Sequence, residues 1–405
     1  MQASFGWTLL SRDALRRAEK QLRDAADGVR DEVGFLALHQ AYADRFFPGT
    51  SVLHTRLRYV LFVPWLYATV AQQRDRQRIS AAVEKQEIIL AGRLKAAGEL
   101  GVIGGLRYPH PTTQPPTMVY WSALAAWRIV RPDTSGTIPS RQTVHRVIAR
   151  KPAHQQVHDD DKQLLMEDEP LFYSVPEPPP AWHDSQQRLD FQLAAGEKRF
   201  LRHCFLAVAR PDSSGAPSLL ARLVEQNVEI TDRLELWSPK VKAAADQSDR
   251  EALRRAKQVA ALSAIGRGVY AALVEELRED HDGLPTDDLH RRNLKNVCDE
   301  FADDALALDV DDIVLDAPTV PSGILRVLRE TQHWMRNPSE GLGSLYEAYQ
   351  TAESRRKGRR ARLTKSLAGR EKRAEWLPDQ HPLATPLHYR WSNVRQLLLD
   401  LKGSP

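Results

Sequence analysis

Apolar residues recur at helical spacing along most of the chain. The spacing is clearest in three stripes: Phe35, Leu38, Tyr42 and Phe46; Leu262, Ile265, Val269, Leu273 and Leu277; and Trp391, Val394, Leu398 and Leu401. Residues three, four or seven positions apart share one face of a helix. Alternating runs of β-branched residues, which would indicate strands, are nearly absent. The pattern predicts an all-α, multi-helix fold with two helical subdomains and little or no sheet.

The most apolar segment is residues 57–67, and we expect it to form a central helix. Pro48 and Gly49 break the chain before it, and Thr50 or Ser51 can cap the new helix. The apolar run over 60–71 is about half as long as a bilayer-spanning helix must be. It therefore predicts a buried helix and no membrane association. We expect further helices over residues 85–97, 118–129, 140–150 and 324–335.

Residues 151–187 interrupt this pattern with an acidic, proline-rich stretch that contains HDDD, MEDE and VPEPPP. We therefore divide the chain into four parts. These are an N-terminal helical domain over 1–150, a linker or insertion over 151–187, a second helical domain over 188–345, and a basic region with a closing helix over 346–405.

Composition indicates an ordinary globular protein in a reducing compartment. The chain has 405 residues, 27% of them charged, and a net charge of +4. Cys204 and Cys298 are too few for a disulfide framework. The first residues lack the pattern of a secretory signal, so we expect a cytoplasmic location.

The strongest charge feature is a basic block over residues 355–373, with ten cationic residues and one acid. Such a block can neutralise phosphates without reading sequence. We expect the contact with nucleic acid to come from Arg355, Arg356, Lys357, Arg359, Arg360 and Arg362. The alternatives are a solvated helix and an intramolecular partner for the acidic stretches.

Residues 140–149 (SRQTVHRVIA) have the pattern of a DNA-recognition helix. Arg141 and Gln142 would face base edges, while Val144 and Ile148 would pack inward. The preceding turn is longer than that of a helix-turn-helix. An amphipathic surface helix is the alternative.

Motifs for metal or cofactor binding are weak, and we expect neither group. His154 and His158 stand four residues apart beside three aspartates, but they fall in the acidic linker. Asp160, Asp161 and Lys162 lack the flanking strands of a nuclease core. No phosphate-binding loop, GxGxxG or GxSxG motif is present.

Arg56 and Arg58 precede the apolar run, where a buried arginine needs a carboxylate partner. Glu32, Asp44 and Glu84 are the candidates, and a structural ion pair is favoured over catalysis. Three polar residues before Trp391 are expected to form a rim around it: His388, Tyr389 and Arg390.

Several motifs together resemble an uncharacterised bacterial family, the domain of unknown function DUF6361. They are SFGW (4–7), FFPGTSVLHTRLRYVLFVPWLY (46–67), VYWSALAAWRI (119–129), RARL (360–363) and YRW (389–391). The resemblance spans nearly the whole chain and implies no activity, cofactor or catalytic residue. It marks as motif residues Pro48, Gly49, Thr50, Ser51, Arg56, Arg58, Tyr59, Trp65, Trp121 and Trp391. It also suggests a setting in bacterial genome defence.

These observations favour a non-enzymatic protein that binds nucleic acid or assembles with other components through the basic block. Two other hypotheses remain. The chain is an enzyme with a nuclease-like or nucleotide-processing site built from scattered residues, or it is a scaffold that binds proteins.

Overall fold

The computed structural model describes residues 32–72, 78–150, 170–212 and 214–403. Within these ranges the chain forms 17 α-helices, four short 3-10 helices and no strand. Two isolated β-bridges join Val130 to Phe172 and Ala209 to Pro217. The all-α prediction is confirmed.

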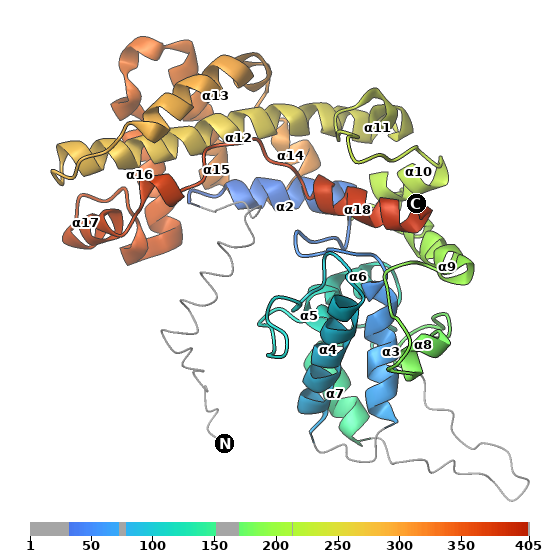
Figure 1. Ribbon diagram of the computed structural model, residues 1–405. Helices are drawn as coiled ribbons and strands as arrows, with labels where there is room; N and C mark the ends of the chain where they lie inside the picture. The colour runs from blue at the N-terminus through green and yellow to red at the C-terminus, as the bar shows by residue number, and fades with distance from the viewer. Residues whose placement is uncertain (1–31, 73–77, 151–169, 213, 404–405) are drawn as a thin grey trace, which may run out of the picture.

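The helices form two units, with α2, α9 and α18 lying between or beside them (Figure 1). The first unit contains α3 (Tyr59–Ala71), α4 (Ile79–Ala96), α5 (Pro116–Val119), α6 (Trp121–Ala126), α7 (Arg141–Arg150) and α8 (Pro180–His183). The elements between or beside the units are α2 (Phe35–Phe46), α9 (Ala195–Leu206) and α18 (Trp391–Lys402).

The second unit surrounds the longest helix, α12 (Gln247–Asp280). Its other α-helices are α10 (Leu219–Glu225), α11 (Pro239–Ala244), α13 (Leu289–Leu306), α14 (Ile313–Asp316), α15 (Ser322–Arg336), α16 (Tyr346–Lys357) and α17 (Leu367–Ala374). The 3-10 helices are η1 (Pro338–Glu340), η2 (Leu342–Leu345), η3 (Gly358–Arg360) and η4 (Pro378–Gln380).

Helix α3 is the centre of the first unit, as its apolar sequence predicts. Every residue from Tyr59 to Tyr67 is buried, including Pro64. A helix that is apolar on all sides needs neighbours on all sides. Helix α4 packs along it, and none of the helices in the described ranges is both long and apolar enough to cross a membrane.

The second half of the predicted linker packs against this unit. The indole N–H of Trp65 donates to the carbonyl of Pro176 at 2.8 Å. The Trp182 ring stacks on Phe62, with ring centroids 5.7 Å apart. Residues 170–187 therefore continue the first unit, while the rest of the predicted linker lies outside the described residues.

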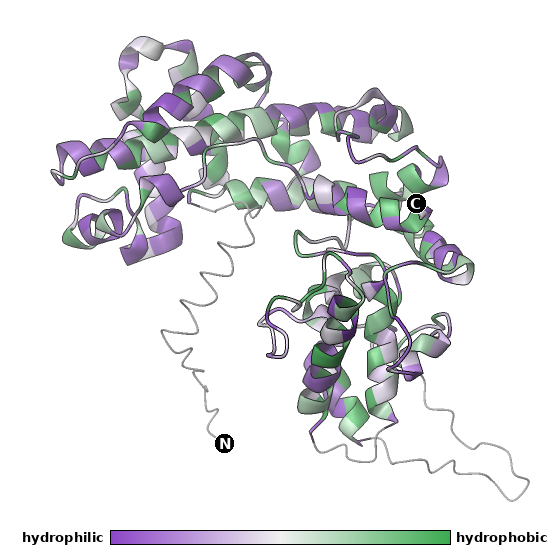
Figure 2. Cartoon of the chain, viewed as in Figure 1, coloured by the Kyte–Doolittle hydropathy of each residue, from purple (hydrophilic) through white to green (hydrophobic). Residues whose placement is uncertain are grey.

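Helix α12 organises the second unit, and α13, most of whose residues are hydrophilic, lies along it (Figure 2). The carboxylate of Glu275 on α12 accepts hydrogen bonds from the backbone N–H groups of His290 and Arg291. These two groups belong to the first turn of α13, which has no earlier helical partners for them. The buried Glu275 thus fixes where α13 begins against α12.

Candidate nucleic-acid interface

The basic block spans α16, η3 and α17 and separates into buried and exposed cations. Arg373 is the most deeply buried, with its side chain fully excluded from solvent. Its guanidinium binds Asp282 through two hydrogen bonds, at 2.6 and 2.7 Å. The hydrogen bonds from Arg373 lower the pKa of Asp282 to about 2. This arginine is committed to holding α17 against the end of α12.

Lys357 and Arg362 form a second internal charge cluster. The Lys357 ammonium lies 3.7 Å from a Glu32 oxygen and 3.6 Å from a Glu353 oxygen, and Arg362 lies 3.7 Å from Glu32. Glu353 is fully buried and also accepts the Tyr270 hydroxyl at 2.7 Å. Burial lowers the pKa of Lys357. Lys357 and Arg362 were expected to contact nucleic acid. The structure instead pairs both cations with acids of the same chain, which was the alternative interpretation of the basic block.

The remaining expected contact residues, Arg355, Arg356, Arg359 and Arg360, are exposed and close together in the chain. The first two occupy the last turn of α16, where cations interact favourably with the helix dipole. Gly358 then turns the chain with φ of +53° and ψ of −126°, and the other two follow in η3. Arg355, Arg359 and Arg360 make no ion pair with any described residue. We call these four arginines the arginine turn.

Two more exposed cations of the block follow the arginine turn. The Lys365 ammonium lies over the Tyr346 ring, 5.3 Å from its centroid. Arg370 is exposed on α17 and donates to the backbone carbonyl of Asp282 at 3.4 Å. Neither forms an ion pair within the described part of the chain, so both retain an unneutralised charge.

Helix α7 contains the other two predicted nucleic-acid residues, and it lies in the first unit, away from α16 and α17 (Figure 1). Val144 and Ile148 are buried, as the amphipathic pattern predicts. Gln142 is exposed, whereas Arg141 is half-buried and turns toward a pocket. The structure therefore does not bring Arg141 and Gln142 together with the arginine turn.

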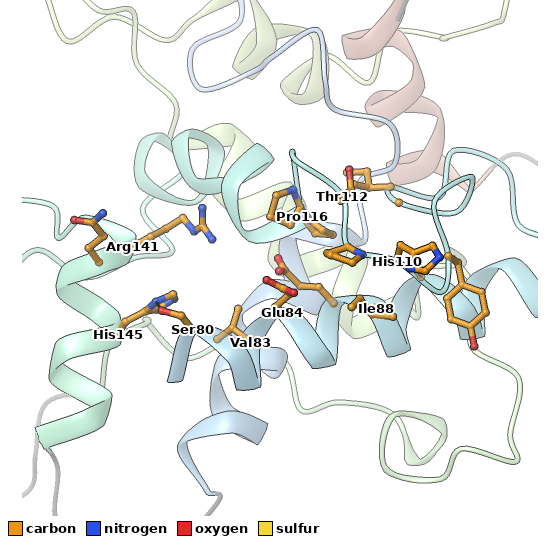
Figure 3. Close-up of a pocket in the computed structure, with 17 residues that line it drawn as sticks. Ser80, Val83, Glu84, Ile88, His110, Thr112, Pro116, Arg141 and His145 are labelled. Atoms are coloured by element: carbon orange, nitrogen blue, oxygen red, sulfur yellow. Dashed lines mark hydrogen bonds between the residues drawn. The ribbon is translucent and has the colours of Figure 1, made fainter. Parts of the chain in front are cut away.

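That pocket lies between α4, α7 and the loop over residues 103–116, and its volume is about 300 Å³ (Figure 3). Arg141 and His145 enter from α7, Glu84 from α4, and His110 and Thr112 from the loop. Sequence reasoning missed this site. Two features of the sequence could have pointed to it. Glu84 and Glu87 have helical spacing, which alone predicts only a polar helix face, and the proline-rich loop alone predicts only a turn.

Two polar groups of the pocket are held by neighbours. Glu87 is buried, and one of its oxygens accepts the backbone N–H of Thr117 at 3.0 Å and its hydroxyl at 2.7 Å. Burial raises the pKa of Glu87 despite these bonds. The His145 ring is bonded to the Tyr67 hydroxyl and the Ser80 hydroxyl, each at 3.1 Å. Burial, with the nearby Arg141, lowers the pKa of His145, so its ring is neutral at pH 7.

The motif residues of the first unit connect distant segments. Arg58 is buried and pairs with Asp190 at 3.0 Å and Glu197 at 2.8 Å. Arg56 pairs with Asp400 at 3.0 Å and lies 3.6 Å from Glu99. Structural ion pairs were expected, but the expected partners Glu32, Asp44 and Glu84 are wrong. The true partners lie up to 344 positions away in sequence, beyond the range of local patterns.

Other motif residues act through hydrogen bonds and close packing. The hydroxyl of Thr50 donates to Phe47 at 2.6 Å, and that of Tyr59 accepts from the N–H of Ile103 at 2.8 Å. Gly49 has φ of +79°, and a Cβ there would lie 2.6 Å from Ala126. Three indole N–H groups each donate to a backbone carbonyl: Trp127 to Pro48, Trp121 to Pro139 and Trp391 to Leu234. Ser51 accepts from the N–H of Leu53.

Among the described residues, no group of three or more His, Cys, Asp or Glu side chains could hold a metal ion. His154, His158 and the Asp160, Asp161, Lys162 set lie outside these residues. Of the three residues expected as a polar rim before Trp391, Arg390 binds Asp44 at 2.6 Å and the carbonyl of Thr50 at 2.7 Å. Tyr389 does not belong to a rim, because it is fully buried and its hydroxyl donates to the carbonyl of Ala256 at 2.9 Å.

Comparison with known proteins identifies a matching family. The model of a family of unknown function, DUF6361, matches residues 4–292, which is more than half of the chain. No curated protein and no solved structure matches. The family resemblance indicated by the sequence motifs is confirmed, and the motifs RARL and YRW lie beyond the matched range. The pocket lies inside the matched range, and the arginine turn lies beyond it.

Proposed function

We propose that this chain, which belongs to the family of unknown function DUF6361, binds the phosphate backbone of nucleic acid through the arginine turn. In this proposal it is a non-enzymatic binding or assembly component of a bacterial system, with genome defence as the setting. One observation carries the proposal: the four arginines are exposed and close together, and Arg355, Arg359 and Arg360 form no ion pair with any described residue. The neighbouring cations Lys357, Arg362 and Arg373 are instead paired with internal acids.

The geometry of the arginine turn supports backbone binding over base recognition. Two of its residues end a helix and two belong to a 3-10 turn, so they do not lie along one helix face that a major groove could accept. Guanidinium groups bind phosphates through two parallel hydrogen bonds and keep their charge at any physiological pH. Lys365 and Arg370 extend the same charge toward α17.

The test measures how binding to duplex DNA depends on salt. Each cation that meets a phosphate releases about one counterion, so four contacts give about a hundredfold loss of affinity between 50 and 200 mM salt. Reversal of Arg355, Arg356, Arg359 and Arg360 to Glu should abolish binding. The helical circular dichroism signal should not change, because exposed charges contribute little to stability.

A matched control reverses four exposed cations on four other helices: Lys85, Lys242, Lys295 and Arg336. This variant has the same net charge as the first. If the control loses as much affinity, binding depends on net charge alone and the arginine turn is not the site. Absence of wild-type binding to duplex and single strands at low salt would also refute the proposal. A sequence-selective loss in the Arg141→Ala, Gln142→Ala variant would instead favour groove recognition by α7.

A further inference from the structure

The pocket between α4 and α7 combines an apolar interior with polar groups of opposite character. Its apolar lining includes Val83, Ile88, Ala91, Ile103, Pro115 and Pro116. Its volume of about 300 Å³ is within the range of small-molecule sites, which are mostly apolar with a few polar groups that fix orientation. The proline rings and isoleucine side chains offer apolar surfaces against which a planar ring can pack.

The polar groups provide hydrogen-bond acceptors beside a hydrogen-bond donor. Glu84 and Glu87 of α4 both line the pocket, and Arg141 enters it from α7 (Figure 3). Arg141 is close enough to Glu87 to interact with its charge. The Nε atom of Arg141 is buried and has no hydrogen-bond partner among the described residues. A buried donor of this kind is satisfied when a ligand supplies the acceptor.

We propose that this pocket binds a 6-oxopurine base such as guanine. The edge of guanine presents two adjacent N–H donors, N1–H and the 2-amino group, which a carboxylate accepts. The O6 and N7 atoms are acceptors, which an arginine binds. Adenine lacks that pair of adjacent donors. A simple ammonium ligand would suit the carboxylates but would be repelled by Arg141.

The neighbours of Arg141 prepare it for this role. His145 is neutral and both of its ring nitrogens are already engaged, by Tyr67 and Ser80. It therefore adds no charge and acts as a positioning residue on the α7 wall. One Glu87 oxygen is likewise engaged by Thr117, which fixes the orientation of this carboxylate in the pocket lining. A polar site whose groups are already oriented binds with less entropic cost.

The same base could arrive as a free nucleoside or nucleotide, or within a single strand. This inference does not rest on the proposed backbone contact, because the pocket and the arginine turn lie on different units. Isothermal titration calorimetry on the full chain with guanosine, adenosine and guanosine monophosphate tests the free forms. A short single-stranded oligonucleotide with one guanine, compared with the same strand containing adenine, tests the second source.

We expect guanosine or the guanine strand to bind at least tenfold more tightly than its adenine counterpart. Arg141→Met and Glu87→Gln should each reduce that affinity at least tenfold, since each removes a charge-assisted hydrogen bond. Glu84→Gln provides a variant at an exposed position if Glu87→Gln does not fold. Arg146→Met is the matched control, because Arg146 is exposed on the same helix and does not line the pocket.

The outcomes separate the two proposals. Loss of guanosine binding in the pocket variants, with no change in the variant that reverses the arginine turn, supports this inference alone. Equal affinity for the guanine and adenine ligands overturns it, as does an absence of binding to guanosine, guanosine monophosphate and the guanine strand.

Discussion

Buried charge pairs determine which cations of the basic block are available to a partner. Arg373 pairs with Asp282, which lies 91 positions earlier in the chain. Lys357 and Arg362 both pair with Glu32. The sequence shows ten cations and one acid in this segment, but it does not show which acids fold back onto them. The separation into buried and exposed cations is therefore a property of the tertiary structure, and charge counting alone could not find it.

The Asp282 and Arg373 pair predicts a specific dependence of stability on pH. The pKa of Asp282 is about 2 in the folded chain, below its ordinary value of 3.8, because Arg373 donates two hydrogen bonds to it. A carboxyl whose folded pKa is lowered contributes stability above its unfolded pKa and loses it as pH falls through the folded value. The contribution here is about 2 kcal/mol.

Urea unfolding of the wild type and of Asp282→Asn, measured from pH 6 to pH 2, checks this. The difference in unfolding free energy should be largest at pH 5 to 6 and should shrink toward pH 2. Asp282 is then protonated in the unfolded chain and in about half of the folded molecules. A difference that stays constant over that range would show that the ion pair contributes no pH-dependent stability.

At the scale of elements, the position of α12 depends on a close contact at Gly266. A Cβ there would lie 2.6 Å from the Phe35 ring of α2 and 3.0 Å from the Tyr349 hydroxyl of α16. Both rings are fully buried and have no room to move aside. The glycine therefore allows three helices to approach one another at one point.

Gly266→Ala should lower the free energy of unfolding by about 1 to 3 kcal/mol, because overpacking outweighs the gain in helix propensity. Thermal unfolding followed by circular dichroism measures this. The control is Gly323→Ala in α15, where a Cβ meets nothing within 4 Å, and its effect should be neutral or stabilising. Similar effects at the two glycines would contradict the packing argument.

The sequence predicts which helices are present better than it predicts the residues at which they begin and end. Helix α7 begins within one residue of its expected start, and its inward residues are the predicted ones. The single helix expected over 118–129 is instead divided into α5 and α6 at Tyr120. The hydroxyl of Tyr120 bonds to the backbone of Thr55 and Arg56, which lie 65 and 64 positions earlier. Long-range bonds of this kind, like the walls of the pocket, leave no periodic signal.

At the scale of the whole molecule, the C-terminal helix α18 joins the two units. The Asp400 carboxylate accepts the Arg56 guanidinium at 3.0 Å and the backbone N–H of Leu57 at 2.8 Å, just before α3 begins. Asn393 also donates to the carbonyls of Val52 and His54. The buried apolar residues of both units belong to one continuous core. We therefore expect the described units to unfold together.

Asp400→Ala tests this coupling, because the Asp400 carboxylate is only 4% exposed and binds the residues just before α3 of the first unit. Its removal leaves the Leu57 N–H without its acceptor and takes from Arg56 the nearer of its two carboxylates, which should cost about 2 kcal/mol. In the wild type, tryptophan fluorescence and far-ultraviolet circular dichroism should report the same urea midpoint. In the variant, the two midpoints should fall by the same amount. Ser392→Ala, at an exposed site on the same helix, should leave the midpoint unchanged. If fluorescence and circular dichroism separate in the wild type, the units unfold independently, and the contacts of α18 do not couple them.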